Sequence, residues 1–118
     1  MIRLTLAYPP SVNTIWRRVG SRTLLSAEGR AYRQTVADAV MLAGVRRGFT
    51  ADQRLRVTLL ACPPDRRRRD LDNLPKALFD ALTHAGVWAD DSQVDSLTIN
   101  RMEPVRGGSV LVTVEVMA

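Results

Sequence analysis

The sequence is short of several residue types, and each shortage excludes a class of protein. Its single cysteine, Cys62, cannot form an internal disulfide, which fits a reducing compartment. Its single histidine, His84, has neither a second histidine nor a cysteine pair to join, so no zinc site and no Ser-His-Asp triad is predicted. No apolar run approaches the roughly 20 residues that span a bilayer, and the amino terminus lacks the shape of a signal peptide. We therefore expect a cytoplasmic protein that makes no membrane contact.

Lysine is also nearly absent, because sixteen arginines accompany one lysine. Genomic base composition explains the choice of arginine over lysine but does not explain where the charges lie. Residues 1–50 carry eight arginines and two acidic residues, a local charge of +6, whereas residues 51–118 carry nine basic and ten acidic residues, a local charge of −1. A basic chain with its acidic residues gathered in one stretch fits an anionic polymer partner and a local cation site.

The acidic stretch spans residues 65–95 and contains seven of the twelve acidic residues. Near its start, four consecutive arginines, Arg66–Arg69, lead directly into Asp70. Asp70 and Asp72 are two positions apart, so in an extended chain their carboxylates point to the same side. Carboxylates beside clustered guanidinium groups suit a divalent cation that faces a phosphate. The alternative is that these aspartates only pair with the arginines on a solvated surface.

The segment that follows Asp72 has the pattern of an amphipathic helix that stops at Gly86. Lys76, the only lysine, lies within about 40° of Asp72 on this helix. A second acidic pair, Asp90 and Asp91, follows the far end of the helix, and must fold back if it is to reach Asp70. The side chains on the apolar face of the helix are Leu74, Leu78, Ala81, Leu82 and Ala85.

Two further elements are predicted before this stretch. Residues 2–8 alternate between apolar and polar side chains, which indicates a half-buried strand. Ser26 followed by Glu28 is typical of a helix start, and the helix is expected to close at Gly48. Between them, residues 9–25 are predicted to form a long loop that contacts nucleic acid. Its candidate residues are Asn13, Trp16, Arg17, Arg18 and Arg22, with Trp16 either stacking on DNA or folding onto the core.

The rest of the chain completes a single domain over residues 1–118. Residues 55–61, 94–102 and 110–116 have strand patterns, and turn residues between the last two predict a carboxy-terminal hairpin. The order β-α-β-α-β-β predicts an α+β fold in which two helices pack on a mixed sheet of about four strands. Phe79 is left as a core-edge residue, a dimer contact or a wedge against DNA bases.

The motifs DRRRRDLDN, a lysine three residues later, and GVWADDSQV resemble the RusA family of Holliday-junction resolvases from bacteria and prophages, as do YPPSVN and SAEGRAYR earlier in the chain. The resemblance implies a RusA-like fold and a homodimeric, magnesium-dependent endonuclease that cuts four-way DNA junctions, with Mn²⁺ as a substitute ion. By position, it implies catalytic roles for Asp70, Asp72, Asp91 and Lys76, of which the three aspartates are the metal ligands. We expect Asp90 and Asn73 to support these ligands, and Arg66, Arg67, Arg68 and Arg69 to contact phosphates.

Two other functions remain open. A basic protein that holds DNA junctions without cutting them would account for the arginines but not for the carboxylates. A related metal-dependent nuclease acting on other branched nucleic acids would use the same site. No residue spacing encodes four-way geometry, so junction specificity comes from the resemblance alone. Because productive resolution needs two symmetric cuts, we expect the active unit to be a two-fold dimer.

Overall fold

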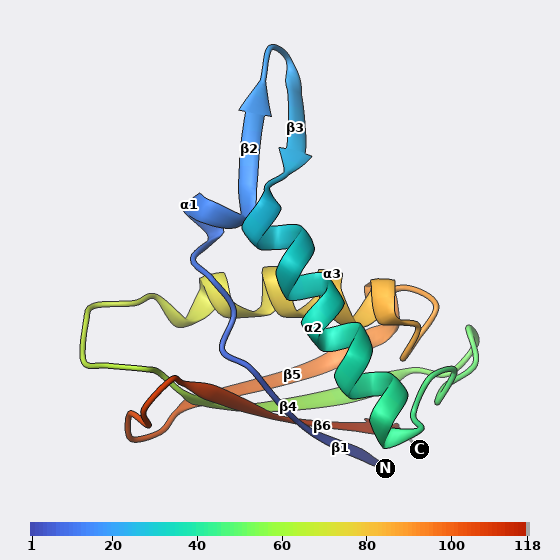
Figure 1. The fold of residues 1–118 in the computed structure, drawn as a ribbon. Coiled ribbons are helices and arrows are strands. Elements are labelled where there is room, and N and C mark those ends of the chain that lie inside the picture. The colour runs from blue at the N-terminus through green and yellow to red at the C-terminus, as the bar shows by residue number, and fades with distance from the viewer. Residues whose placement is uncertain (118) are drawn as a thin grey trace.

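The computed structural model describes residues 1–117, apart from the side chains of Val12 and Asn13. It consists of a four-stranded sheet with two long helices on one face, and a two-stranded hairpin that projects from the helical side (Figure 1). The predicted α+β fold is therefore confirmed. In chain order the elements are β1 (Ile2–Leu6), α1 (Val12–Ile15), β2 (Trp16–Val19), β3 (Arg22–Leu25), α2 (Ala27–Ala43), β4 (Leu55–Cys62), the 3₁₀ turn η1 (Leu71–Asn73), α3 (Leu74–Ala85), the 3₁₀ turn η2 (Asp91–Gln93), β5 (Val94–Arg101) and β6 (Ser109–Val116).

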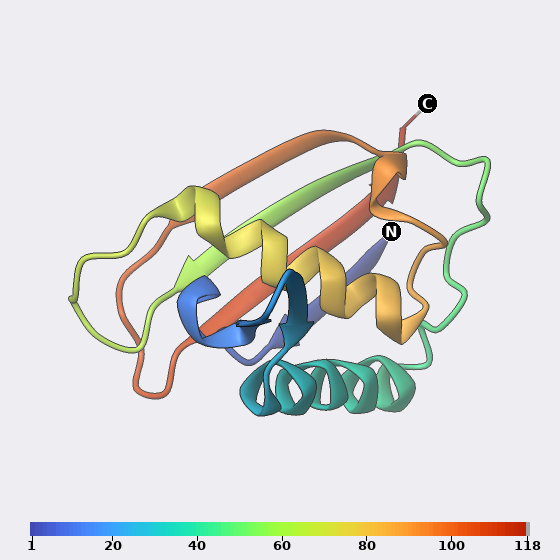
Figure 2. The same cartoon turned by 90° about the horizontal axis from the view of Figure 1, so that it is seen from above.

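The main sheet has the strand order β1-β6-β4-β5, with β5 parallel to β4 and the other pairs antiparallel. Alternate residues of β4 and β6 face the helices, which explains the predicted two-residue pattern. Seen from above, α2 and α3 lie side by side over the sheet (Figure 2). The fully buried side chains on the helical face of the two central strands are Leu55, Val57, Leu59, Val110, Val112 and Val114.

Helix α3 is the crossover between the parallel strands β4 and β5. It runs back across the sheet, so its first turn lies at the carboxyl end of β4 and its last turn lies near the start of β5 (Figure 1). The helix spans twelve residues and ends at Gly86, which has the left-handed conformation (φ 83°) of a helix C-cap. The predicted stop and apolar face are confirmed, since every predicted apolar residue of this helix is buried.

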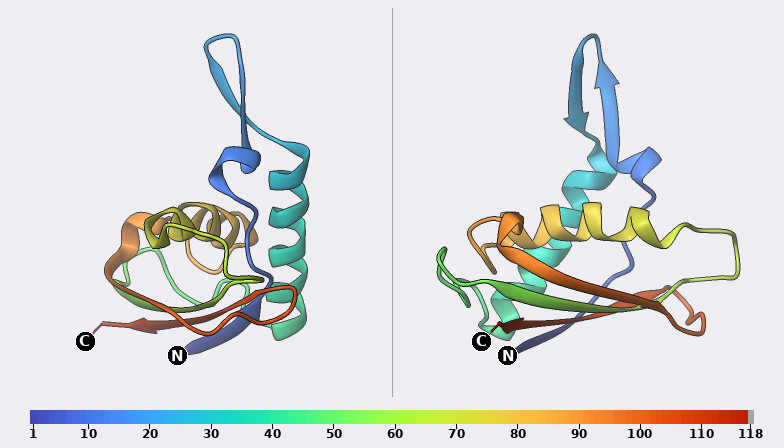
Figure 3. Two further views of the ribbon diagram at one scale, coloured as in Figure 1. Left: turned by 90° about the vertical axis from the view of Figure 1, so that its left-hand side faces the viewer. Right: turned by 180° about the vertical axis from the view of Figure 1, so that it is seen from behind.

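The prediction of a loop over residues 9–25 is wrong. This region forms α1 and the antiparallel hairpin β2–β3, in which Gly20 supplies the positive φ (61°) of the turn. The base of the hairpin is tied to α2, because the Ser26 N–H donates to the Ile15 carbonyl at 2.7 Å and Ile15 is buried. Arginines on both hairpin faces concealed the alternation that would have revealed its strands, and Figure 3 shows the hairpin standing clear of the sheet.

Two other predictions need correction. Strands β5 and β6 form no carboxy-terminal hairpin, because β4 lies between them. The crossover through α3 places β5 outside β4, and β6 then returns to the gap between β4 and β1, where both of its edges are paired. Helix α2 ends at Ala43 with a left-handed Gly44 cap, rather than closing at Gly48. The Ser26 cap is confirmed, since its hydroxyl oxygen accepts from the Gly29 N–H at 3.1 Å.

Phe79 belongs to the edge of the core, the first of its three predicted roles. It is half-buried and packs edge-to-face against Trp88, with ring centroids 5.4 Å apart. Trp88 is buried and donates its indole N–H to the Thr83 hydroxyl at 2.6 Å. This aromatic pair anchors the turn between α3 and η2.

Candidate functional site

Most carboxylates of the acidic stretch have structural partners. Asp65 accepts from Arg69 at 2.8 Å, Asp80 accepts from Arg33 at 2.8 and 2.9 Å, and Asp95 accepts from Arg54 at 3.0 Å. The Arg33–Asp80 pair links α2 to α3, and the Arg54–Asp95 pair links the residue before β4 to β5. Hydrogen bonds from these arginines lower the pKa of the Asp65 and Asp95 carboxyls below their usual range.

Asp90 is also engaged. Its carboxylate accepts from the Ser92 N–H at 3.1 Å in a capping box at the start of η2, and the Gln93 side chain reciprocates by accepting from the Asp90 N–H at 3.0 Å. Hydrogen bonds from Ser92 lower the pKa of the Asp90 carboxyl. The amide of Gln93 is buried and donates to the carbonyls of Thr50 and Gln53 at 2.8 and 3.0 Å. Asp90 therefore builds the turn that holds Asp91 outward.

The three remaining acidic residues of the stretch are the predicted metal ligands, Asp70, Asp72 and Asp91. All three are exposed. Among the described residues, none of their carboxylates takes part in a hydrogen bond or an ion pair. The alternative that these aspartates pair with the arginine run is thus not seen. Exposed carboxylates without protein partners have the oxygen ligands that Mg²⁺ and Mn²⁺ bind, so the donor chemistry fits such an ion.

The structure does not bring all three carboxylates together in one chain. Asp70 and Asp72 lie at the first turn of α3, whereas Asp91 lies beyond its last turn (Figure 1). Within the part of the chain that the structure describes, no group of three or more His, Cys, Asp or Glu side chains is close enough to hold a metal ion. The predicted folding back of Asp91 toward Asp70 is therefore absent from the single chain.

Lys76 lies on the exposed face of α3, one turn after Asp72. Its ammonium nitrogen is 5.9 Å from the ring centroid of Trp16, at the base of the hairpin. The Trp16 ring is half-buried, and its indole N–H is buried without a hydrogen-bond partner among the described residues. Trp16 thus packs against Lys76 rather than standing free for base stacking, and it joins the hairpin to the first turns of α3.

The four arginines of the run are not equivalent. Arg69 binds Asp65, lies over the Tyr8 ring at 5.8 Å, and its carbonyl accepts from Arg101. Its hydrogen bond with Asp65 raises the pKa of the Arg69 guanidinium. Arg66 pairs with Glu103 at 3.1 Å and Arg67 with Asp65 at 3.8 Å, both at the surface. Only Arg68 has no carboxylate partner among the described residues.

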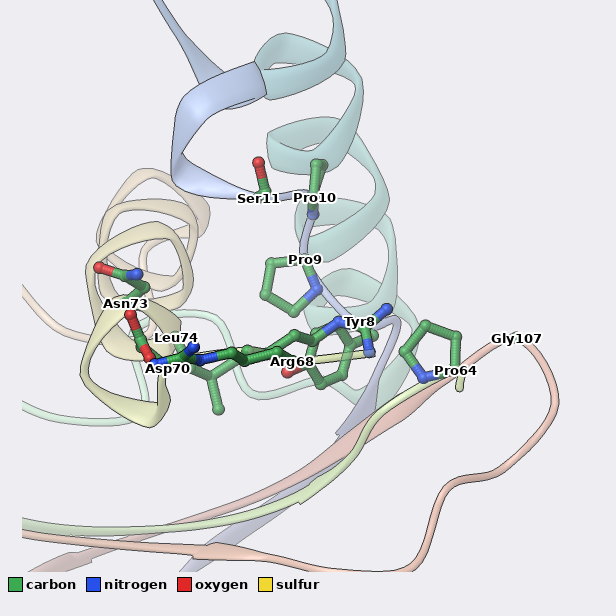
Figure 4. Close-up of a pocket in the computed structure, with 11 residues that line it drawn as sticks. Tyr8, Pro9, Pro10, Ser11, Pro64, Arg68, Asp70, Asn73, Leu74 and Gly107 are labelled. Atoms are coloured by element: carbon green, nitrogen blue, oxygen red, sulfur yellow. The ribbon is translucent and has the colours of Figure 1, made fainter. Parts of the chain in front are cut away.

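Arg68 lines an open pocket of about 700 Å³ beside Asp70. Figure 4 shows Asp70 and Asn73 on the α3 side of this pocket, and Tyr8 and Pro64 on the opposite side. Sequence reasoning missed the pocket, although the Y-P-P-S segment of the chain was a signal for it. The remaining lining residues are Pro9, Pro10, Ser11, Arg69, Leu74 and Gly107.

The hairpin exposes three of the predicted nucleic-acid contacts, Arg17, Arg18 and Arg22. Arg17 and Arg22 lie on one face of the ribbon with Val19 and Leu24, because cross-strand partners share a face. The side chain of Asn13 lies outside the described residues, so its predicted contact stays a prediction.

Fold and site together define a small α+β protein whose exposed carboxylates face an arginine-lined pocket, an arrangement suited to a nuclease. A sequence profile described as Endodeoxyribonuclease RusA matches residues 7–117. The chain belongs to this family and is a structure-specific endodeoxyribonuclease, which confirms the predicted resemblance and enzyme class.

Several curated relatives are similar over nearly the whole chain. The "Crossover junction endodeoxyribonuclease RusA" of Escherichia coli strain K12 is 45% identical over 114 residues, which cover 97% of this chain and 93% of the relative. The enzyme of Enterobacteria phage 82 is 44% identical over the same shares. That of Enterobacteria phage HK97 is 42% identical over 106 residues, covering 90% of this chain and 87% of the relative. None of the described helices is both long and apolar enough to cross a membrane.

Proposed function

We propose that this chain resolves four-way DNA junctions as a homodimer, with Mg²⁺ held by Asp70, Asp72 and Asp91. One observation carries the metal assignment: of the seven acidic residues in the stretch, these three alone have no partner among the described residues. A divalent ion held there would supply an activated water and neutralise charge on the phosphate. The names of the relatives, which specify crossover junctions, support the choice of substrate.

The residues around Asp70 and Asp72 have separate tasks. Arg68, which lacks a carboxylate partner within the described residues, is available to bind a DNA phosphate in the pocket beside Asp70. The Asp65–Arg69–Tyr8 contacts hold the wall from which Arg68 extends. Lys76, held near Trp16, places a positive charge on the same face of α3 as Asp72, where it offsets charge on the reacting phosphate.

The hairpin extends this cationic surface away from the sheet. Arg17, Arg18 and Arg22 are exposed on an element that stands clear of the body of the protein (Figure 3). A two-stranded ribbon of this kind fits a DNA groove or follows a backbone, where arginines contact phosphates without reading sequence. We assign the hairpin to binding a DNA arm and the pocket to the strand that is cut.

One observation favours the second candidate, a junction-binding protein that does not cut: the three carboxylates do not meet within one chain. Incubation of the protein with labelled four-way, duplex, flap and single-stranded DNA separates the two candidates. With Mg²⁺ or Mn²⁺ we expect cleavage of the four-way junction at symmetric positions, and with a chelator we expect binding alone. Binding without cleavage in every divalent ion would instead establish the second candidate.

A further inference from the structure

Asp91 is too far from Asp70 and Asp72 to share an ion with them inside one chain. Helix α3 separates them with twelve residues, about 18 Å at the α-helical rise. Oxygen atoms that bind one Mg²⁺ each lie about 2.1 Å from it, so ligands of the same ion are within roughly 4 Å of one another. Strand β5 gives an independent measure, because it starts next to η2 and ends where Arg101 binds the Arg69 carbonyl. Its eight residues extend about 26 Å.

A local rearrangement cannot close this gap, because η2 is fixed in place. The buried amide of Gln93, only 2% exposed, binds the Thr50 and Gln53 carbonyls on the segment that leads into β4. The Trp88–Thr83 hydrogen bond and the Asp90 cap hold the chain on either side of Asp91. Moving Asp91 toward Asp70 would leave these buried polar groups without partners, which is costly.

We propose that each complete metal site is shared between two copies of the chain, with Asp70 and Asp72 from one copy and Asp91 from the other. The inference rests on the proposed junction-cutting function and explains why that function needs a dimer. A two-fold axis beside the middle of α3 brings the first turn of one helix next to the last turn of its partner. A single isologous interface then completes both sites at once.

The surface that carries this axis is the edge formed by β5 and the outer side of α3. Strand β5 is an edge strand of the main sheet, and its outward backbone groups have no strand partner within residues 1–117. Leu97, in the middle of β5, is 41% exposed, and Phe79 on α3 is half-buried. Antiparallel pairing of β5 with its copy would continue the sheet and place the α3 helices side by side in opposite directions.

Charge complementarity supports this occupant over an unrelated partner. One end of the edge carries the arginine run, including the unpaired Arg68, and the other end carries Asp90 and Asp91. Two-fold symmetry places the basic end of each copy against the acidic end of its partner. Like charges would meet instead if the copies docked in parallel, which is unfavourable.

Mixed dimers test the sharing directly. Two differently tagged copies, one Asp70→Asn and one Asp91→Asn, are co-expressed and purified through both tags. A shared arrangement leaves one site with wild-type ligands, so we expect nicking of a cruciform plasmid. A dimer of wild type with the double variant D70N/D91N should be inactive. The reverse result, an inactive mixed pair and an active wild-type–double-variant dimer, would overturn the proposal.

A second readout does not depend on activity. In a Cys62→Ser background, Asp72→Cys and Asp91→Cys copies are co-expressed, purified through both tags and treated with a short bismaleimide linker. We expect a linked two-chain species on denaturing gels for this mixture and far less for dimers carrying only one of the two cysteines. Absence of that species, or a monomeric mass by light scattering, rejects the sharing. If the wild-type dimer cuts no junction while the link still forms, the proposed function fails and the shared geometry stands.

Discussion

The two ends of α3 treat their acidic residues differently. At the first turn, Asp70 and Asp72 are both free of partners among the described residues, while the neighbouring Arg69 is fixed by Asp65 and Tyr8. At the far end, Asp90 is consumed by a helix cap and Asp91 alone is left free. The comparison teaches that adjacent identical residues can divide structural and chemical work, because a cap fixes one carboxylate and turns the next outward.

The largest effect should come from removing a free carboxylate at either end. We expect Asp70→Asn and Asp91→Asn each to lower the cleavage rate at least about 100-fold, because each removes a charged metal ligand. Junction binding should stay intact or tighten, because a negative charge facing DNA is lost. Band-shift and cleavage assays on the same preparation measure both. Cleavage near the wild-type rate by Asp70→Asn would refute the metal site.

The next effect concerns the edge between the two ends. Leu97→Glu places a charge in the proposed interface, and we expect it to dissociate the dimer and abolish paired cuts. Leu42→Glu is the matched control, since Leu42 is 89% exposed on α2, away from β5. Light scattering gives the mass, and the ratio of linear to nicked cruciform plasmid reports coupled cutting. Equal behaviour of the two variants would locate the interface elsewhere.

Within the arginine run, Arg68 and Arg69 should separate binding from stability. Arg68→Ala should weaken binding to many DNA structures alike and reduce the log–log salt slope by about one for its lost phosphate contact. Arg69→Ala should lower the free energy of unfolding by about 1 kcal/mol through the loss of a partly exposed hydrogen bond and a cation–π contact. Salt titrations and denaturant unfolding measure the two quantities. The same salt slope in Arg68→Ala and the wild type would show that Arg68 is only a solvated charge.

Asp90→Ala should mark the contrast with Asp91 in stability. Loss of the cap is expected to cost about 1 kcal/mol of unfolding free energy, whereas Asp91→Asn should leave stability within about 0.5 kcal/mol of the wild type. Urea unfolding of both variants makes the comparison. If Asp91→Asn proved the less stable of the two, the assignment of roles in this pair would be reversed.

The smallest effect is on acid stability. Hydrogen bonds lower the pKa of Asp90 in the folded state below its unfolded value of about 3.9. Its contribution is therefore present above the unfolded pKa and is lost as the pH falls toward and through the folded pKa. We expect unfolding free energy to decline less between about pH 5 and pH 2 in Asp90→Ala than in the wild type, by a small amount because the group is solvent-screened. Identical pH profiles would exclude this linkage.

The sequence alone determined the local elements and the chemistry. Apolar periodicity predicted α3, β4 and β6, because a two-sided element must bury one face whatever lies against it. Residue type and spacing selected Asp70, Asp72, Asp91 and Lys76, and the family motifs identified the enzyme. The β2–β3 hairpin was missed because its exposed arginines leave no apolar alternation, and its position depends on Ile15 packing under α2.

Only the tertiary structure decided how these residues are distributed. Which aspartates are free depends on partners distant in sequence, such as Arg33 for Asp80 and Arg54 for Asp95. The position of β6 between β1 and β4, and of β5 at the edge, follows from the crossover and not from any local pattern. The placement of Asp91 at the opposite end of α3 from Asp70 has the same cause, because a parallel crossover carries the chain across the full length of the sheet before the next strand begins.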